Sequence, residues 1–344
     1  MTQRAVRFSL ISGLMACLVA LTAAGPAPAQ DMRYFRIGTG TSSGTYFTVG
    51  GLIAGAISNP PGSRPCERGG SCGVPGLIGV AQATEGGIEN LDLLRSGAIE
   101  AALVQSNLAF WAYGSLGVYE RRPPFADLRA IATLYTETVQ IVVRADSPIR
   151  AIGDLRGHKV SIGEPGSAFA LDARIILGGL GLTEKKYTPV YLRPGASVDQ
   201  FVDGKIDALF IVGGAPFTAI SDAAARVPIR LLAIDAEAAA SLRRARHLFT
   251  EATVPADVYP GVPETATLGV TALLVVRAGL DEELVRGVTR ALWHPSTRRA
   301  LAQGFPNGSF LPLPMARDDT PIPLHPGAER FYRESDGGAA KKTP

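Results

Sequence analysis

The sequence predicts an α/β protein with two lobes and mostly parallel sheets. Strand-like and helix-like segments alternate along most of the chain, which is typical of parallel strands connected by covering helices. The alternation pauses after residue 143 and begins again near residue 154. About 315 of the 344 residues remain once an N-terminal signal is set aside, more than one hydrophobic core usually covers.

In the first half, apolar runs predict two helices and five strands. The helix expected over 46–57 has Val49, Ile53 and Ala56 on one face, and a glycine ends the second helix, over 88–96. The strands are expected at 35–39, 78–83, 101–104, 131–134 and 139–143.

The second half repeats this order. A strand over 159–162 is followed by a glycine and serine turn and by a helix that ends at Leu177, and another glycine ends a helix over 198–203. A helix over 281–292 precedes a Pro-rich coil and a short terminal helix. The remaining strands are expected at 190–192, 208–212, 229–233 and 270–276.

The first residues have the pattern of a secretory signal. Two arginines precede the apolar run 8–24, and Ala27-Pro28-Ala29 fits the small-residue rule for cleavage. We therefore expect residues 1–29 to be a signal peptide, cleaved near Ala29, and the protein to be exported. An uncleaved membrane anchor is the alternative, although the apolar run is short for a bilayer span.

Charge and composition describe an ordered globule without a nucleic-acid partner. The hydrophobic content is 46% and the charged content 19%. Removal of the two arginines of the signal leaves 32 of the 34 basic residues, against 31 acidic ones. Such a balance gives no sign of the clustered basic face of a nucleic-acid-binding protein.

Cys66 and Cys72 lie in a loop over 59–76 that is rich in Gly and Pro. An isolated, closely spaced pair in an exported chain predicts a disulfide. Half of a metal site is the alternative, but no His or further Cys lies near in sequence. We expect no metal and no cofactor.

Polar turns follow four predicted strand ends, two in each half. Ligands of open α/β sheets lie beyond the carboxyl ends of strands, and a helix N-terminus offers N–H groups to an anion. No Arg or Lys follows these strand ends closely, so backbone N–H groups, hydroxyls and an amide would have to meet an anionic ligand. The turns lie near residues 40–46, 105–107, 163–167 and 213–216.

The segment from Gly40 to Gly44 also matches G-x-S-x-G, the nucleophile elbow of α/β hydrolases. A secreted serine hydrolase that uses Ser42 is therefore the enzyme alternative, although only about a dozen residues of the exported chain precede Ser42 and a hydrolase sheet needs several earlier strands. A dinucleotide fingerprint is not matched, because its third glycine falls at residue 44 rather than 43 and no acid stands about twenty residues on. We expect no catalytic residue.

Several short motifs are spread over residues 35–334. They are Ile37-Gly38-Thr39-Gly40, Gly44-x-Tyr46, Gly50-Gly51, Arg95-Ser96-Gly97, Gln105-Ser106, Pro124-Phe125-x-Asp127-Leu128-Arg129-Ala130, Asp154-Leu155-x-Gly157, Gly163-x-Pro165-Gly166-Ser167, Ile206-Asp207-Ala208 and Pro323-Leu324-His325-Pro326-Gly327-Ala328. In these motifs the chain resembles the TAXI class of solute-binding proteins of tripartite ATP-independent periplasmic (TRAP) transporters.

The resemblance implies a type II periplasmic-binding-protein fold, in which crossing hinge strands at 139–143 and 270–276 join two lobes. Lobe 1 would comprise 32–143 plus 268–334, lobe 2 would comprise 144–267, and 335–344 would be a flexible tail. It also implies a non-enzymatic periplasmic receptor that hands a small solute to the integral-membrane subunits of a TRAP permease. A ligand-sensing partner of a membrane signalling protein is the alternative on the same fold.

Ligands of that family are typically glutamate, glutamine or dicarboxylates. This chain has Glu164 where the family often has Asn, and Ala168-Phe169-Ala170 where relatives are more polar. The resemblance thus implies a small organic anion, an amino acid or a carboxylate that can carry an apolar tail. The residues implied to bind it are Thr39, Gly40, Gly44, Thr45, Tyr46, Gln105, Ser106, Gly166, Ser167 and Gly214.

Overall fold

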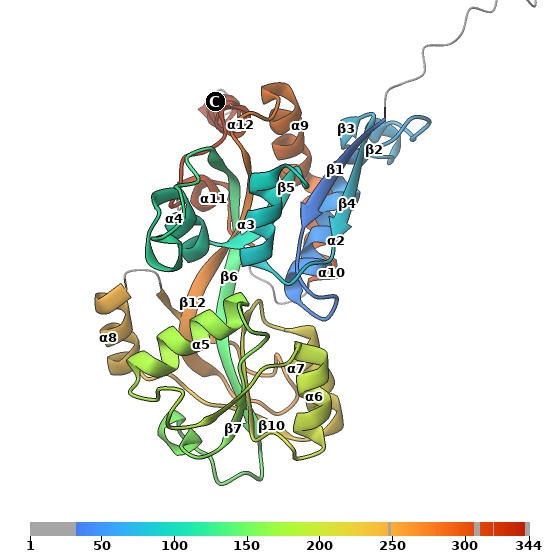
Figure 1. Ribbon diagram of the computed structural model, residues 1–344. Coiled ribbons are helices and arrows are strands. Elements are labelled where there is room, and N and C mark those ends of the chain that lie inside the picture. The colour runs from blue at the N-terminus through green and yellow to red at the C-terminus, as the bar shows by residue number, and fades with distance from the viewer. Residues whose placement is uncertain (1–31, 247–248, 306–309, 319, 341–344) are drawn as a thin grey trace, which may run out of the picture.

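The computed structural model describes residues 32–246, 249–305, 310–318 and 320–340 (Figure 1). The expected signal peptide, 1–29, lies outside these ranges. Within them, no helix combines the length and the apolar character that a membrane span requires.

One mixed sheet of ten strands runs through the described part of the molecule from one end to the other. Its main path is β4-β1-β5-β12-β6-β9-β7-β8, with β10 beside β6 and β11 beside β12. The strands are β1 Arg33–Gly38, β4 Leu77–Gln82, β5 Ala101–Gln105, β6 Leu128–Arg144, β7 Lys159–Ser161, β8 Thr188–Val190, β9 Ala208–Gly213, β10 Ile229–Leu231, β11 Thr250–Val254 and β12 Thr265–Arg277.

The predicted α/β class is confirmed, but the sheet is less parallel than expected. β1 pairs in parallel with β4 and β5, and β7 pairs in parallel with β8 and β9. The long strands β6 and β12 are antiparallel to each other and to every strand beside them. Parallel pairing thus holds at the flanks, where helices connect the strands, and fails at the centre, where β6 and β12 cross from lobe to lobe.

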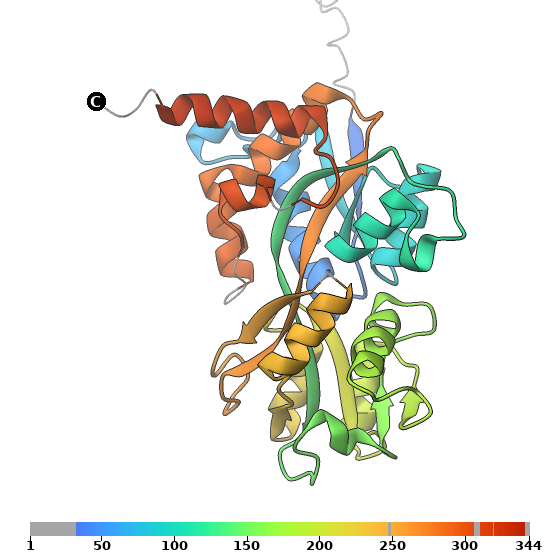
Figure 2. The ribbon, with the colours of Figure 1, turned by 90° about the vertical axis from the view of Figure 1, so that its left-hand side faces the viewer.

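Two long strands connect an upper and a lower lobe (Figures 1 and 2). β6 has 17 residues, and it contains both strands that were expected at 131–134 and 139–143. The expectation of two strands is wrong because residues 135–138 continue the extended backbone and pair with β12 and β9. The expected crossing segments 139–143 and 270–276 do lie on β6 and β12.

Helices cover both faces of the sheet in the upper lobe. Val49, Val285 and Tyr332 belong to the core on one face, and Leu94 and Leu108 to the core on the other. The helices are α2 Thr45–Ile57, α3 Gly87–Ser96, α4 Ser106–Gly114, α9 Glu282–Trp293, α10 Pro295–Gly304, α11 Leu313–Asp318 and α12 Pro326–Ala340. α12 is longer than the short terminal helix expected and continues beyond residue 335, where a flexible tail was predicted.

The lower lobe is built in the same way around two further cores, one on each face of its sheet. Its helices are α5 Ala168–Gly179, α6 Pro194–Val202, α7 Thr218–Arg226 and α8 Ala236–Arg246. α6 begins earlier than predicted because Pro194 fits the first turn of a helix. Val139, Ile141 and Val143 of β6 pack in a lower core, so the exact division of the chain between lobes stays a prediction.

A small arm carries the two cysteines. The short strands β2 Ser58–Asn59 and β3 Val74–Pro75 pair in parallel at its base. Cys66 and Cys72 are joined by a disulfide, with their Cα atoms 4.7 Å apart. Single 3₁₀ turns complete the described structure at Cys66–Arg68, Gly117–Tyr119 and Ile152–Leu155.

Candidate functional site

A cavity of about 50 Å³ lies between the lobes, close to the crossing of β6 and β12. A buried water needs roughly 10–15 Å³ on this measure, so the cavity has room for a few water-sized groups. It is lined from the upper lobe and β6 by Gly40, Thr41, Gly44, Thr45, Tyr46, Glu85, Gly86, Gly87, Gln105 and Glu137, and from the lower lobe by Glu164, Ser167, Ala168, Phe169, Val212, Gly213 and Phe217.

Six of the ten residues expected to bind the ligand line this cavity, and their role as ligand contacts stays a prediction. They are Gly40, Gly44, Thr45, Tyr46, Gln105 and Ser167.

The other four expected residues do not line the cavity. Thr39 is fully buried, and its hydroxyl donates to the Gln82 carbonyl at 2.7 Å. Ser106 is the first residue of α4, one position beyond the polar strand end. Gly166 adopts a left-handed turn with φ 82°, which directs the chain toward Ser167. The Gly214 carbonyl accepts a hydrogen bond from the Thr45 hydroxyl at 3.3 Å.

Several helices begin at the cavity without a side chain that caps them, α2 and α3 among them. The residues before α2 and α3 are Gly44 and Gly86, and neither provides a side-chain hydrogen bond to the first turn. Both glycines line the cavity. The first N–H groups of a helix have no partner within the helix and carry partial positive charge. These two helix starts can therefore bind an anionic group.

The start of α5 differs although it faces the same cavity. Ser167 precedes α5 and accepts a hydrogen bond from the N–H of Ala170 at 3.2 Å. One donor of this helix is thus already satisfied. α5 contributes an apolar surface instead, because Phe169 packs edge-to-face against Phe217, with ring centroids 6.1 Å apart.

The floor of the cavity holds a buried carboxyl group that the sequence analysis did not find. Glu137 lies in β6 and is 2% exposed. Its Oε2 accepts a hydrogen bond from Nε2 of Gln105 at 3.2 Å. Glu137 Oε1, Gln105 Oε1 and the Tyr46 hydroxyl are buried and have no hydrogen-bond partner among the described residues. The floor therefore presents polar atoms that lack a partner.

A second buried carboxyl lies behind this floor and links the lobes. Asp172 of α5 is fully buried, and its Oδ1 accepts a hydrogen bond from Nδ2 of Asn107 at 3.3 Å. Its Oδ2 has no hydrogen-bond partner in the described structure. Asn107 belongs to α4 of the upper lobe, so this bond joins the two lobes beside the cavity.

Burial dominates the acid–base behaviour of both groups. It raises the pKa of Glu137 to about 8, and the Tyr46 hydroxyl and the Gln105 amide, which act in the opposite direction, offset only part of this effect. It raises the pKa of Asp172 to about 7, against hydrogen bonds from Gln105 and Asn107 that act in the opposite direction. In the empty protein near neutral pH, Glu137 is therefore largely protonated.

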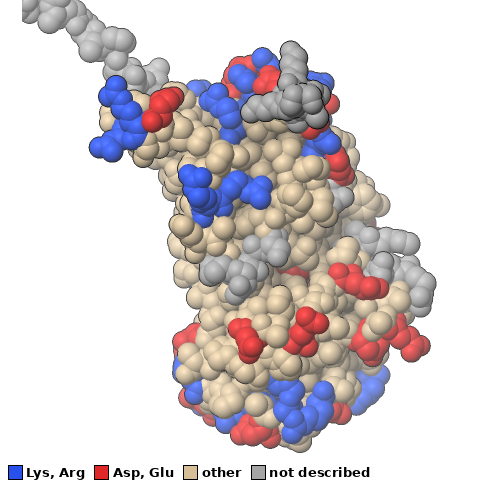
Figure 3. Space-filling view, turned by 180° about the vertical axis from the view of Figure 1, so that it is seen from behind, with Lys and Arg blue, Asp and Glu red and all other residues tan. Residues whose placement is uncertain are grey.

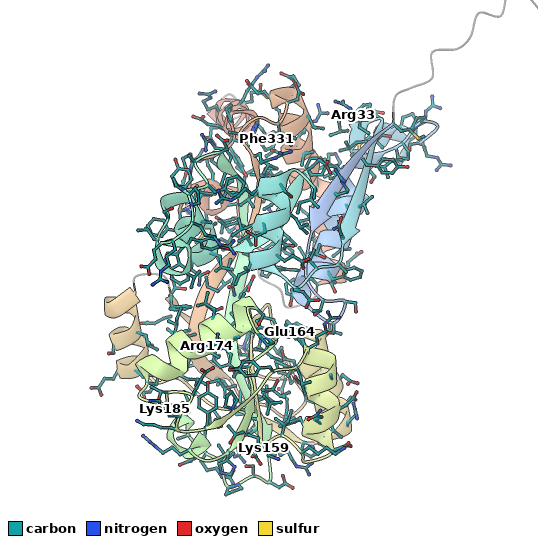
Figure 4. The ribbon with its side chains drawn as sticks, viewed as in Figure 1. Arg33, Lys159, Glu164, Arg174, Lys185 and Phe331 are labelled. Atoms are coloured by element: carbon teal, nitrogen blue, oxygen red, sulfur yellow. A yellow bond between two sulfur atoms is a disulfide. The ribbon has the colours of Figure 1, made fainter. Side chains whose placement is uncertain are left out.

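An ion triad lies at the mouth of the cavity. Arg193 of the lower lobe pairs with Glu85 of the upper lobe, and its Nε lies 3.1 Å from Oε1 of Glu164. Burial raises the pKa of Glu164, the neighbouring Glu85 carboxylate acts in the same direction, and Arg193 opposes both. Glu164 lies at the boundary between the lobes (Figure 4). Both carboxylates that line the mouth thus have a cation beside them.

None of the three described histidines is hydrogen-bonded to Ser42. Ser42 is exposed on the turn before α2. His158 lies beside Asp207, His294 contacts Ser296, and the ring of His325 lies within hydrogen-bond distance of a backbone carbonyl. The fourth histidine of the sequence lies outside the described residues.

One group of side chains has metal-ligand types and spacing. The sulfurs of Cys66 and Cys72 and the ring of His294 lie within 4.8 Å of one another. The chain fold brings His294 to the cysteines although it is distant in sequence. The sulfurs are joined in a disulfide, so they are not available as thiolate ligands.

Comparisons with known proteins give one matching family model and several solved structures of low identity. A model of the NMT1-like family matches residues 37–336. The periplasmic aliphatic sulphonate binding protein SsuA from Escherichia coli is similar at 15% identity and a TM-score of 0.43, over 88% of this chain and 87% of that chain. A TctC solute binding protein from Polaromonas is similar at 16% identity and a TM-score of 0.46, over 91% of this chain and 99% of that chain.

Proposed function

The chain belongs to the NMT1-like family, and from that premise we propose that it is an exported receptor for a small organic anion. In this proposal the two lobes close around the solute, and the closed receptor delivers it to the membrane subunits of a TRAP-type transporter. The short motifs over residues 35–334 support the TRAP assignment. The protein itself carries out no reaction.

The observation that carries this proposal is the cavity between the lobes with two uncapped helix starts facing into it. N–H groups of helix starts bind anions without a basic side chain. Among the residues that line the cavity there is no Lys or Arg, so the N–H groups are the main positive partners there. Phe169 and Phe217 form an apolar wall that can accept an apolar tail.

Contacts between the lobes support capture by closure. Asn107 bonds to Asp172, the Thr45 hydroxyl bonds to the Gly214 carbonyl, and Arg193 pairs with Glu85. Each contact joins a residue of the upper lobe to one of the lower lobe, so the structure has the lobes in contact around the cavity. A solute that contacts both lobes stabilises the closed arrangement relative to the open one.

A thermal-shift screen on purified protein that starts at residue 30 tests the proposal. The panel contains mono- and dicarboxylates, amino acids, amines and neutral sugars. A carboxyl-containing solute at about 100 times its dissociation constant should stabilise the protein by roughly 2.7 kcal/mol. A Ser42→Ala variant should respond in the same way as the wild type, since Ser42 has no part in binding.

Two results would contradict the proposal. One is a panel in which no carboxyl-containing solute stabilises the protein, and the other is loss of solute binding in the Ser42→Ala variant. Small-angle scattering supplies a second measurement. A saturating solute should lower the mean radius of gyration as open molecules close, and an unchanged radius would contradict capture by closure.

A further inference from the structure

We propose that the arm with the two cysteines is a metal site under redox control: once Cys66 and Cys72 are reduced, they and His294 bind a thiophilic ion of the Zn²⁺ class. While the disulfide is intact its sulfurs cannot serve as thiolate ligands, so the site exists only in the reduced protein. None of the three residues lines the cavity between the lobes, and the metal site is therefore independent of the proposed receptor function.

The ligand atoms already lie close together. The sulfurs of Cys66 and Cys72 and a ring nitrogen of His294 are within 4.8 Å of one another, and Nε2 of His294 is 3.8 Å from the sulfur of Cys66. Zinc binds thiolate sulfur at about 2.3 Å and imidazole nitrogen at about 2.0 Å, so two such ligands of one tetrahedral ion lie roughly 3.5 Å apart. One edge of the tetrahedron is thus close to its required length before any movement.

The backbone of the arm holds the two cysteines together even without the bond between their sulfurs. The N–H of Ser71 donates to the Arg64 carbonyl at 3.1 Å, and the N–H of Gly70 donates to the Pro65 carbonyl at 3.0 Å. Pro65 directly precedes the first cysteine and Ser71 directly precedes the second. Reduction breaks only the sulfur–sulfur bond and leaves these backbone bonds in place, so the two thiols stay near enough to chelate one ion.

The third ligand is fixed by elements outside the arm. His294 lies between α9 and α10, and its Nδ1 is 2.7 Å from the hydroxyl of Ser296, so Nε2 is the nitrogen that faces Cys66. A metal-bound imidazole donates its other N–H to a partner, and the Ser296 hydroxyl can accept it. Val74 at the base of the arm and Val285 of α9 belong to one buried core, which keeps the arm beside the histidine.

A groove gives an ion access to these ligands. It has a volume of about 490 Å³ and is lined by the two cysteines and His294, together with Arg290 and Glu67. Two thiolates neutralise a divalent cation, so the loaded site brings no net charge next to Arg290, and a cation beside the empty site favours the thiolate form of the cysteines. Three protein ligands leave the fourth tetrahedral position to a water molecule from the groove.

Reduction precedes loading, and a dithiol supplies the two electrons. A thiolate of the dithiol attacks one sulfur of the disulfide, which forms a mixed disulfide and releases the other cysteine as a thiolate. The second thiolate of the reductant then attacks the reductant's own sulfur in the mixed disulfide. This step releases the remaining cysteine and leaves the reductant as a cyclic disulfide. Zn²⁺ binds the two thiolates, so binding displaces up to two protons from the reduced cysteines.

Zinc titrations of the reduced and the oxidised protein test the proposal. The protein starts at residue 30, so Cys66 and Cys72 are its only cysteines. A phosphine reduces it and is then removed, and a thiol assay should find two thiols after reduction and none before. In competition with a chromophoric chelator, the reduced protein should bind one Zn²⁺ at least about a hundredfold more tightly than the oxidised protein. Co²⁺ in place of Zn²⁺ should show the visible absorption of a tetrahedral ion and a thiolate charge-transfer band.

A matched pair of histidine variants links metal binding to this site. His294→Asn removes the imidazole but keeps a side chain that can cap the start of α10, so zinc affinity of the reduced protein should fall at least about tenfold while the fold is retained. His158→Asn is the control, because His158 lies beside Asp207 in the lower lobe, and it should leave zinc affinity within about twofold. Thermal unfolding scans of each reduced and oxidised protein check that it is folded.

Three outcomes overturn the metal site. Equal zinc affinity of the reduced and the oxidised protein would show that the sulfurs do not bind the ion. Wild-type affinity in His294→Asn would show that the imidazole is not a ligand. A reduced protein without a folded transition, with or without zinc, would show that the arm holds its ligands only through the disulfide. None of these outcomes bears on solute capture, which the thermal-shift screen tests separately.

Discussion

The mouth and the floor of the cleft both hold glutamates, but their surroundings differ. At the mouth, Glu85 and Glu164 share Arg193, whose side chain is 64% exposed. At the floor, Glu137 is 2% exposed and shares its environment with an amide and a tyrosine. The comparison shows that burial, rather than residue type, decides whether a carboxyl group keeps its proton near neutral pH. The exposed Arg193–Glu85 pair joins the lobes weakly, whereas the buried Glu137 has a strongly raised pKa.

The largest expected effect is the pH dependence of stability in the empty protein. Because the folded state raises the pKa of Glu137 to about 8 and that of Asp172 to about 7, it binds more protons than the unfolded state between about pH 5 and about pH 8. This stabilisation is complete only below about pH 4, where both states are protonated, and it is lost as the pH rises toward 8. The free energy of unfolding should fall by on the order of 6 kcal/mol between about pH 5 and about pH 8, measured by urea denaturation.

A double variant provides the control for this measurement. Glu137→Gln with Asp172→Asn removes both buried acids and should flatten the pH dependence over the same window. A wild-type protein with the same free energy of unfolding at about pH 5 and about pH 8 would show that the pKa values of the floor carboxyls are no more strongly shifted than those at the mouth.

The next effect concerns solute affinity at the floor. Gln105→Ala removes the amide that bonds to Glu137 and lines the cavity. Such a change should weaken solute binding by tenfold or more, about 1.4 kcal/mol, in a calorimetric titration. Ser106→Ala is the neighbouring control and should change affinity little, because Ser106 does not line the cavity. Similar losses in both variants would place the solute elsewhere.

The smallest effect is expected at the mouth. Arg193→Gln breaks the exposed pairs with Glu85 and Glu164, which are worth at most about 1 kcal/mol and are screened by salt. Affinity should change by less than about fivefold, and less still at high ionic strength. Arg226→Gln is a matched control, since Arg226 bridges Asp199 and Asp222 within the lower lobe. A loss at the mouth as large as that of Gln105→Ala would remove the distinction between the two regions.

Periodicity was sufficient to predict the α/β class, the two lobes and most strands of the flanks. It failed at the centre, because the polar residues around Glu137 look like a break between two strands. In the structure they are the part of β6 that passes through the cleft. A charged residue inside an otherwise apolar run was therefore the available signal for the floor.

The candidate site shows the same limit. Gln105 was predicted because it ends a strand, a position that sequence can identify. Asp172 could not be predicted, since its role depends on α5 of one lobe approaching Asn107 of the other. The distribution of charged side chains over the surface could not be predicted from the sequence either. On the face opposite that of Figure 1, basic side chains lie in the middle of the upper lobe and acidic ones just below the constriction, while both signs are mixed at the top and bottom of the molecule (Figure 3).

Three of the polar contacts described above join the upper lobe to the lower lobe. Asn107 with Asp172, Thr45 with Gly214 and Arg193 with Glu85 join protein groups only. Their combined strength therefore sets the fraction of empty molecules that are closed at any moment. In the proposed transport cycle, an empty closed receptor would occupy the permease as a loaded one does. The strength of these contacts would thus decide how strongly solute-free receptors compete with loaded ones for the transporter.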